Sequence, residues 1–182
     1  MATIIDKMYA DHKALHDLLT GLNETSLASD ADNKLKKVLL VSAASYFEHE
    51  ITTVLIQFVA DTSQNHEALL ALIRAKVISR QYHTYFQWEG KNANSFFGLF
   101  GEQFLTESKA NVREQEGLDD SVRAFLEIGS NRNQMMHENF GTFPMEKTAE
   151  EVYELYKQAH LFVDYIRRRL GVVSKQGDKT SQ

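Results

Sequence analysis

The sequence predicts an all-α protein, and three observations support that fold class. Apolar residues recur at the spacing of a helix, rather than alternating, along almost the whole chain. The segment from Lys34 to Ala60 is long and apolar on most sides, as is typical of the central buried helix of a bundle. A final segment begins with a Thr148–Glu151 capping box and continues as an apolar stripe. We therefore expect a helical bundle.

The composition is that of one soluble globular domain. The 182 residues are 43% hydrophobic and 25% charged, with a single proline, Pro144. Because cysteine is absent, disulfides and thiolate metal sites are excluded. No stretch has the pattern of a secretion signal or the apolar length of a membrane span. We expect a cytoplasmic protein with no membrane partner, made of one domain over residues 1–173 and a disordered tail over residues 174–182.

The net charge of −5 argues against a protein that coats nucleic acid nonspecifically, since that binding mode needs many lysines and arginines. A local basic site remains possible, because a groove can be positive on an acidic protein. Positive residues cluster at Arg74, Lys76 and Arg80 and again at 167–169. The preference of cations for a helix C-terminus also explains the second cluster.

The first half of the chain predicts three helices. The first runs from about Ile4 to Leu22, and its apolar residues are expected to face a core: Ile5, Met8, Leu15, Leu18, Leu19 and Leu22. The polar stretch from Asn23 to Asn33 is rich in turn and cap residues and predicts a break. The second helix runs from about Lys34 to Ala60, and the third from about Gln64 to Ser79.

The second half opens with an aromatic stretch from Tyr82 to Trp88. The segment up to Glu116 predicts one or two short helices, because its apolar side chains are too many to lie exposed. A further helix starts near Asp119, and the stretch from Asn139 to Met145 predicts a loop. The last helix has a continuous apolar stripe: Val152, Leu155, Tyr156, Ala159, Phe162, Val163, Ile166 and Leu170.

A polar run over residues 129–140 separates the apolar stripes of the last two helices, and it contains Arg132, Asn133 and His137. If the run is helical, Asn133 and His137 stand four residues apart on one face. Arg132 then needs its long side chain to reach the same space. Histidine exchanges a proton near neutral pH, and arginine holds a phosphate with two hydrogen bonds. Together they can support RNA cleavage by the substrate's own 2′-hydroxyl without a metal.

The same residues also have an ordinary structural interpretation. Arg132 can bond the carboxylate of Glu127 or Glu138, or a helix-end carbonyl, while His137 caps the end of a helix.

The stretch from Asp120 to Leu170 resembles the C-terminal half of HEPN domains, in which an Arg-polar-x-x-x-His motif ends one helix and a loop and a long amphipathic helix follow. It is most similar to the RiboL-PSP-HEPN subgroup, whose Arg-Asn-x-x-apolar-His pattern is met by Arg132, Asn133, Met136 and His137. The segment 42–48 is similar to the small-residue helix of that subgroup, which ends in an acidic residue.

This resemblance implies a HEPN-like bundle of four to five core helices with additional short helices. It also implies a metal-independent endoribonuclease that needs no cofactor, of the kind found in toxin, antiphage and RNA-processing systems. His137 would be the catalytic residue, Arg132 would position the scissile phosphate, and Asn133 would orient one of the two. Glu48 would be a supporting polar contact.

The partners implied are RNA, a second copy of the chain whose motif completes the cleft, and an antitoxin or regulatory protein. Candidate dimer contacts lie from Phe96 to Phe104 and near Phe140 and Phe143, and packing in the core explains these residues about as well. Two features depart from the family pattern: Glu138 places negative charge beside the phosphate site, and the segment 82–116 is an insertion.

Two other hypotheses remain. The first is a hemerythrin-like di-iron bundle, with candidate ligands at His12, His16, Glu48, His49, Glu50, His66, His160 and Asp164. In that pattern Tyr46 and Leu70 stand where ligands should be, so we expect no metal site. The second is a catalytically silent binding module, and the intact Arg132 and His137 count against it.

Overall fold

The fold was obtained as a computed structural model that describes residues 2–172. The described residues form helices and loops with no strand, which confirms the all-α fold class. The predicted tail over residues 174–182 lies outside the described residues. The helices are α1 (Ile4–Gly21), α2 (Thr25–Thr62), α3 (Glu67–Ile73), the π-helical turn η1 (Arg74–Ile78), α4 (Tyr82–Tyr85), α5 (Asn94–Gly98), α6 (Glu102–Glu114), α7 (Leu118–His137) and α8 (Ala149–Arg169). Among residues 2–172, no helix combines the length and the apolar character needed to cross a bilayer.

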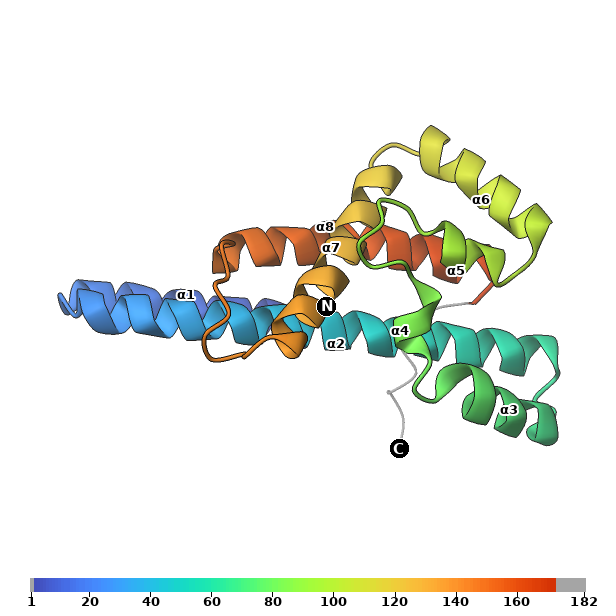
Figure 1. The fold of residues 1–182 in the computed structure, drawn as a ribbon, viewed down its shortest axis with the longest axis horizontal. Coiled ribbons are helices and arrows are strands. Elements are labelled where there is room, and N and C mark those ends of the chain that lie inside the picture. The colour runs from blue at the N-terminus through green and yellow to red at the C-terminus, as the bar shows by residue number, and fades with distance from the viewer. Residues whose placement is uncertain (1, 173–182) are drawn as a thin grey trace, which may run out of the picture.

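The core of the bundle consists of four long helices (Figure 1). α2 is the central element, because α1, α7 and α8 all pack against it. α8 lies alongside α2, whereas α7 crosses the pair (Figure 1). α3 and η1 pack against α2, while α5 and α6 pack against each other and α6 also contacts α7. The predictions of a central second helix and of short helices between Trp88 and Glu116 are therefore confirmed.

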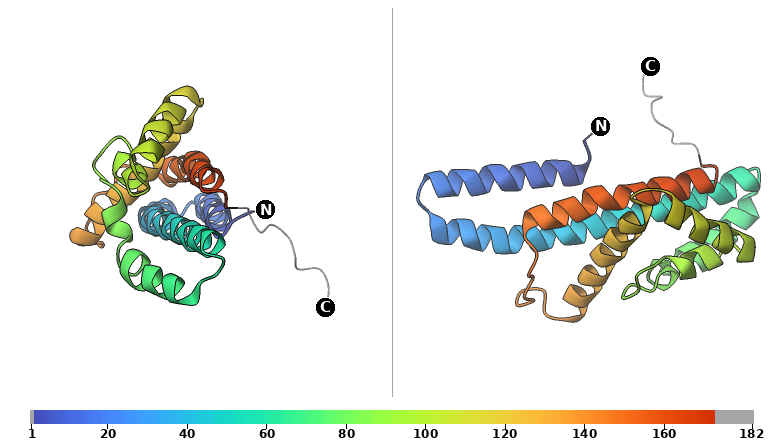
Figure 2. Two further views of the ribbon diagram at one scale, coloured as in Figure 1. Left: turned by 90° about the vertical axis from the view of Figure 1, so that its right-hand side faces the viewer. Right: turned by 90° about the horizontal axis from the view of Figure 1, so that it is seen from above.

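The prediction that the apolar residues of the first helix all face a core is wrong for the C-terminal half of α1. Ile5 is buried, but Leu15, Leu18 and Leu22 are 39%, 59% and 62% exposed rather than part of the core. Only the first half of α1 reaches α8, where the Tyr9 and Tyr153 rings stack at 4.0 Å. The turn between α1 and α2 projects beyond the start of α8 (Figure 2), so the later leucines have no third helix to pack against.

The predicted break from Asn23 to Asn33 is shorter in the structure, because α2 already begins at Thr25. Its early polar residues lie on the helix surface, where Lys34 pairs with Asp30 at 2.6 Å over one helical turn. The third helix starts later than predicted, at Glu67, but continues through the π-helical turn η1 to Ile78, close to the predicted end. Gln64 and Asn65 have positive φ angles of 52° and 60°, so the chain turns before α3 can start.

The hairpin of α7 and α8 follows the prediction closely. Thr148 Oγ accepts a hydrogen bond from the Glu151 amide at 3.1 Å, and the Glu151 carboxylate accepts one from the Thr148 amide at 2.7 Å. The loop between the helices spans residues 138–148. Buried Ser121 joins α7 to α8, since its Oγ donates to the Gln158 carbonyl at 2.6 Å and accepts from the Phe162 amide at 2.7 Å.

Candidate active site

The motif occupies the last turns of α7, which is one continuous helix up to His137. Its buried face packs on the core through Val122, Phe125, Leu126, Ile128 and Met135. Arg132 and Asn133 are half-buried and His137 is exposed. The 3.6-residue repeat of the helix thus directs the apolar residues inward and leaves the motif at the edge of the bundle.

Arg132 contacts one residue of its own helix and one of α2. Its Nη1 donates to Asn133 Oδ1 at 3.0 Å, and its Nη2 lies 3.7 Å from Glu48 Oε2. The two charged side chains are 37% and 41% exposed, so solvent still reaches the pair. Glu127 instead pairs with Lys147 at 2.7 Å, so the alternative that gave Arg132 a Glu127 partner is wrong. Glu48 therefore lies beside Arg132 where α2 contacts α7. The resemblance to HEPN domains implied a supporting polar contact from this residue.

His137 is the final residue of α7 and its imidazole is exposed. Among residues 2–172 the ring has no hydrogen-bond or ion-pair partner, and the adjacent helix-end bond runs from the Glu138 amide to the Gln134 carbonyl at 2.9 Å. The described structure therefore leaves the His137 ring exposed at the end of α7, rather than using it as a helix cap.

Two adjoining hollows connect these side chains. The inner recess contains Arg132 and is lined by Ala44, Phe47, Glu48, Tyr82, His83, Trp88, Phe125, Ile128, Gly129, Arg132 and Asn133. The outer groove contains His137 and is lined by Gln87, Trp88, Glu89, Gly90, Ser130, Asn133, Gln134, His137 and Glu138. Asn133 and Trp88 belong to both, so they form the boundary between the arginine and the histidine.

The segment before α5 supplies one wall of both hollows. Tyr82, His83 and Trp88 come from the predicted insertion, and sequence reasoning gave none of them a role in the site. Burial raises the pKa of Tyr82, the nearby Glu48 charge raises it further, and Arg132 opposes the shift. Tyr82 therefore keeps its proton and acts as a neutral polar neighbour of the Arg132–Glu48 pair.

The loop after the motif is tied to α2. Lys37 is 9% exposed and donates to the carbonyls of Phe140 at 3.0 Å and Gly141 at 3.3 Å. Phe140 itself remains 42% exposed and is available for a dimer contact. Phe96 and Phe97 are 0% and 1% exposed, so the prediction that they contribute to a dimer surface is wrong, because core packing already uses them.

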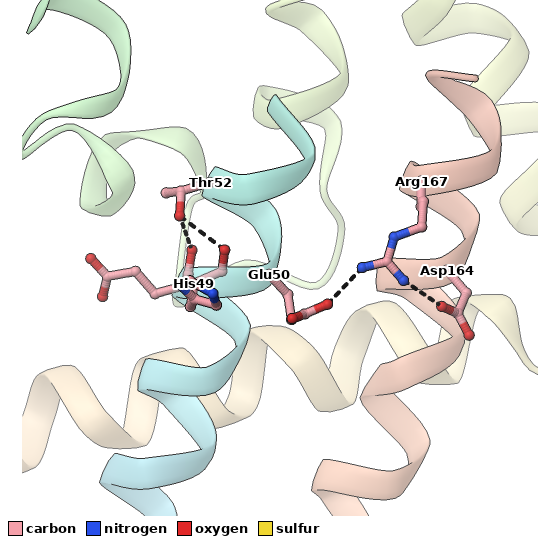
Figure 3. A network of polar contacts seen from close by, with 6 residues as sticks. His49, Glu50, Thr52, Asp164 and Arg167 are labelled. Atoms are coloured by element: carbon pink, nitrogen blue, oxygen red, sulfur yellow. Dashed lines mark hydrogen bonds and ion pairs between the residues drawn. The ribbon is translucent and has the colours of Figure 1, made fainter. Parts of the chain in front are cut away.

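The candidate di-iron ligands do not converge in the structure. Figure 3 shows Glu50 directed at Arg167 of α8, with 2.6 Å between carboxylate and guanidinium, while Arg167 also reaches Asp164 at 3.5 Å. His66 caps α3 through Nδ1, and His12 pairs with Asp32 at 3.1 Å. No set of three histidine, aspartate or glutamate side chains within residues 2–172 is placed to hold a metal ion. The di-iron hypothesis therefore has no support in the described part of the chain.

Comparison with known proteins places this fold and motif in a family. The chain is 25% identical over 165 residues to the pesticidal crystal protein Cry13Aa of Bacillus thuringiensis, a match that covers 86% of this chain and 20% of that protein. This chain thus spans about a fifth of the length of that relative. No solved structure matches this chain. The RiboL-PSP-HEPN family profile matches residues 6–171, from α1 through the Arg132–His137 motif to the end of α8, so the chain belongs to the RiboL-PSP-HEPN family.

Proposed function

We propose that this protein is a metal-independent endoribonuclease that cleaves single-stranded RNA as a homodimer. The observation that carries the proposal is the boundary formed by Asn133, which lines both the recess of Arg132 and the groove of His137. A phosphate held by Arg132 at the mouth of its recess would lie beside the adjoining groove that the His137 imidazole lines. Membership of the family supports the same assignment.

The side chains suit a transesterification. The 2′-hydroxyl must lose a proton, the leaving 5′-oxygen must gain one, and the phosphorane between them carries negative charge. The Arg132 guanidinium offsets that charge through paired hydrogen bonds, while Asn133 and Glu48 hold its orientation at 3.0 and 3.7 Å. His137 performs one proton transfer, because its ring is exposed to the groove.

A second copy of the chain supplies the other proton transfer in this proposal. One protomer brings a single motif histidine, so a two-fold axis that places two α7 ends opposite each other completes the cleft. The activity suits a toxin, an antiphage defence factor or an RNA-processing enzyme, restrained by an antitoxin or another regulatory protein. The relative named a pesticidal crystal protein favours the toxin setting.

The test is cleavage of single-stranded RNA in the presence of a chelator. The parent protein should leave 2′,3′-cyclic phosphate ends, and His137→Ala should cleave about a hundred- to ten-thousand-fold more slowly. Arg132→Ala should be severely impaired, and Arg132→Lys should recover little, because an ammonium cannot make the forked contact. His16→Ala, an exposed histidine on α1, is the matched control and should cleave like the parent.

Two results would change the assignment. If His137→Ala cleaves as fast as the parent, the motif has a structural role and the catalytic roles are wrong. If the parent cleaves no RNA at all, a silent binding module becomes the better description.

A further inference from the structure

Trp88 is held in a fixed position against α7. The indole Nε1–H donates to the His83 carbonyl at 2.9 Å, and the ring is roughly parallel to Phe125, with 28° between planes and 6.0 Å between centroids. Its six-membered ring also lies directly on Gly129. These contacts fix the plane of the ring, yet the side chain remains half-buried and lines both hollows.

The charges in the outer groove indicate what this ring can receive. Beside Trp88 and His137 the groove has two carboxylates, Glu89 and Glu138, and no lysine or arginine. The two carboxylates therefore disfavour further phosphates in this groove, whereas the Arg132 guanidinium attracts the scissile phosphate at the Asn133 boundary. A nucleobase has the opposite character. It is flat and uncharged, and bases with amino groups can donate hydrogen bonds to carboxylates.

The geometry points to Trp88 as a stacking platform for one nucleobase of the RNA substrate, beside the phosphate held by Arg132. This inference rests on the proposed function and adds a specificity residue to it. Stacking on an aromatic side chain requires an unpaired base, so the platform selects single-stranded RNA. The insertion that contains Trp88 thereby becomes part of the substrate site.

Tryptophan fluorescence reports on this site directly, because Trp88 is the single tryptophan of the chain. The full-length His137→Ala variant, which keeps Trp88 and the remaining groove residues, is titrated with a short single-stranded RNA while tryptophan fluorescence is followed. Saturable quenching by the single strand, with much weaker quenching by the same RNA annealed into a duplex, is the expected result. Absent quenching, or equal quenching by both forms, would overturn the stacking role.

Affinity for labelled RNA gives a second readout in the same His137→Ala background. Adding Trp88→Ala should weaken binding roughly five- to a hundred-fold, as the loss of one stacked base does, and Trp88→Phe should restore much of it. Phe104→Ala is the matched control, since Phe104 is a half-buried aromatic on α6 that lines neither hollow. If Trp88→Ala and Phe104→Ala weaken binding equally, the effect is general destabilisation and the inference is wrong.

The two proposals fail in different ways. If the parent protein cleaves RNA, but RNA does not quench Trp88 fluorescence and Trp88→Ala does not weaken RNA binding, the endoribonuclease function stands and the stacking subsite is wrong. A parent that cleaves nothing but still shows single-strand quenching at Trp88 loses the catalytic proposal and keeps a base-binding groove. Quenching by a peptide but not by RNA would assign the groove to a protein ligand and overturn the inference.

Discussion

Gly129 determines how closely the Trp88 ring can approach α7. A Cβ at this position would lie 2.1 Å from both Cε3 and Cζ3 of the indole, far inside contact distance. Glycine within a helix costs roughly 0.5–1 kcal/mol relative to alanine. The aromatic wall of the site therefore depends on a residue that weakens the helix carrying the motif.

We predict that Gly129→Ala lowers the free energy of unfolding by about 1–3 kcal/mol, because the ring must move to make room. Trp88 fluorescence should shift to longer wavelength as the displaced indole becomes more exposed. Gly21→Ala is the control: it lies at the end of α1, no atom is within 4 Å of its added Cβ, and it should be neutral or slightly stabilising. Equal unfolding curves and spectra for both variants would contradict the packing described.

Glu48 is predicted to matter for cleavage more than for stability. Exposed ion pairs contribute about 0–1 kcal/mol, so Glu48→Gln should leave the unfolding midpoint almost unchanged. Cleavage should fall about ten- to a hundred-fold, because the Arg132 guanidinium loses the carboxylate 3.7 Å away that helps to hold it. Initial rates and urea unfolding of the same preparation would measure both effects.

Glu127→Gln is the matched control for that experiment, since it removes an equally exposed carboxylate of α7 whose partner is Lys147. It should cleave at the parental rate. If both glutamine variants lose the same activity, Glu48 has no special relation to Arg132.

At the scale of elements, local interactions determine where α8 begins, although α7 and α8 also pack closely against each other. The capping box at Thr148 and Glu151 fixes the start of α8, and the Glu151 carboxylate has a lowered pKa because the Thr148 amide and hydroxyl hydrogen-bond to it. α1 also begins with a capping box, formed by Thr3 and Asp6, but only the first half of this helix meets α8.

Thr148→Ala should lower the free energy of unfolding by about 0.5–2 kcal/mol, because the Glu151 amide loses its acceptor. Thr148→Ser should recover most of that loss, since serine caps a helix equally well. Thr53→Ala removes an exposed threonine from within α2 and should be neutral or slightly stabilising. The midpoints of thermal unfolding of the three variants, compared with that of the parent, test this prediction. A Thr148→Ala midpoint equal to that of Thr53→Ala would rule out the cap contribution.

At the scale of the whole molecule, we predict a homodimer. The proposed cleavage needs two proton transfers, whereas one chain brings one motif histidine on an exposed helix end. Light scattering coupled to size exclusion should give twice the mass of one chain. The exposed Phe140 lies close to the motif, so Phe140→Glu should shift the equilibrium towards monomer and reduce cleavage in parallel. A fully active monomer would contradict the two-fold mechanism.

Features that follow from local periodicity could be predicted from the amino-acid sequence alone. The all-α class, the central second helix, the stripe of α8 and its capping box are properties of residues close together in the chain, where spacing reports directly on the buried face. The resemblance to HEPN domains implied that the motif ends a helix, and Arg132, Asn133 and His137 do lie in the last turns of α7. The start of α2 at Thr25 was missed, because polar residues that suit a turn also suit an exposed helix face.

The packing of the helices was needed to show which distant residues share a site and which apolar residues share a core. Glu48 meets Arg132, and Trp88 covers Gly129, because α2, α7 and the 82–116 segment pack together, and sequence spacing carries no information on that packing. The same reason explains Leu15, Leu18 and Leu22, which repeat as a core stripe should but lie exposed. An apolar stripe is buried only where another element covers it, and α8 begins too late along α1 to cover these residues.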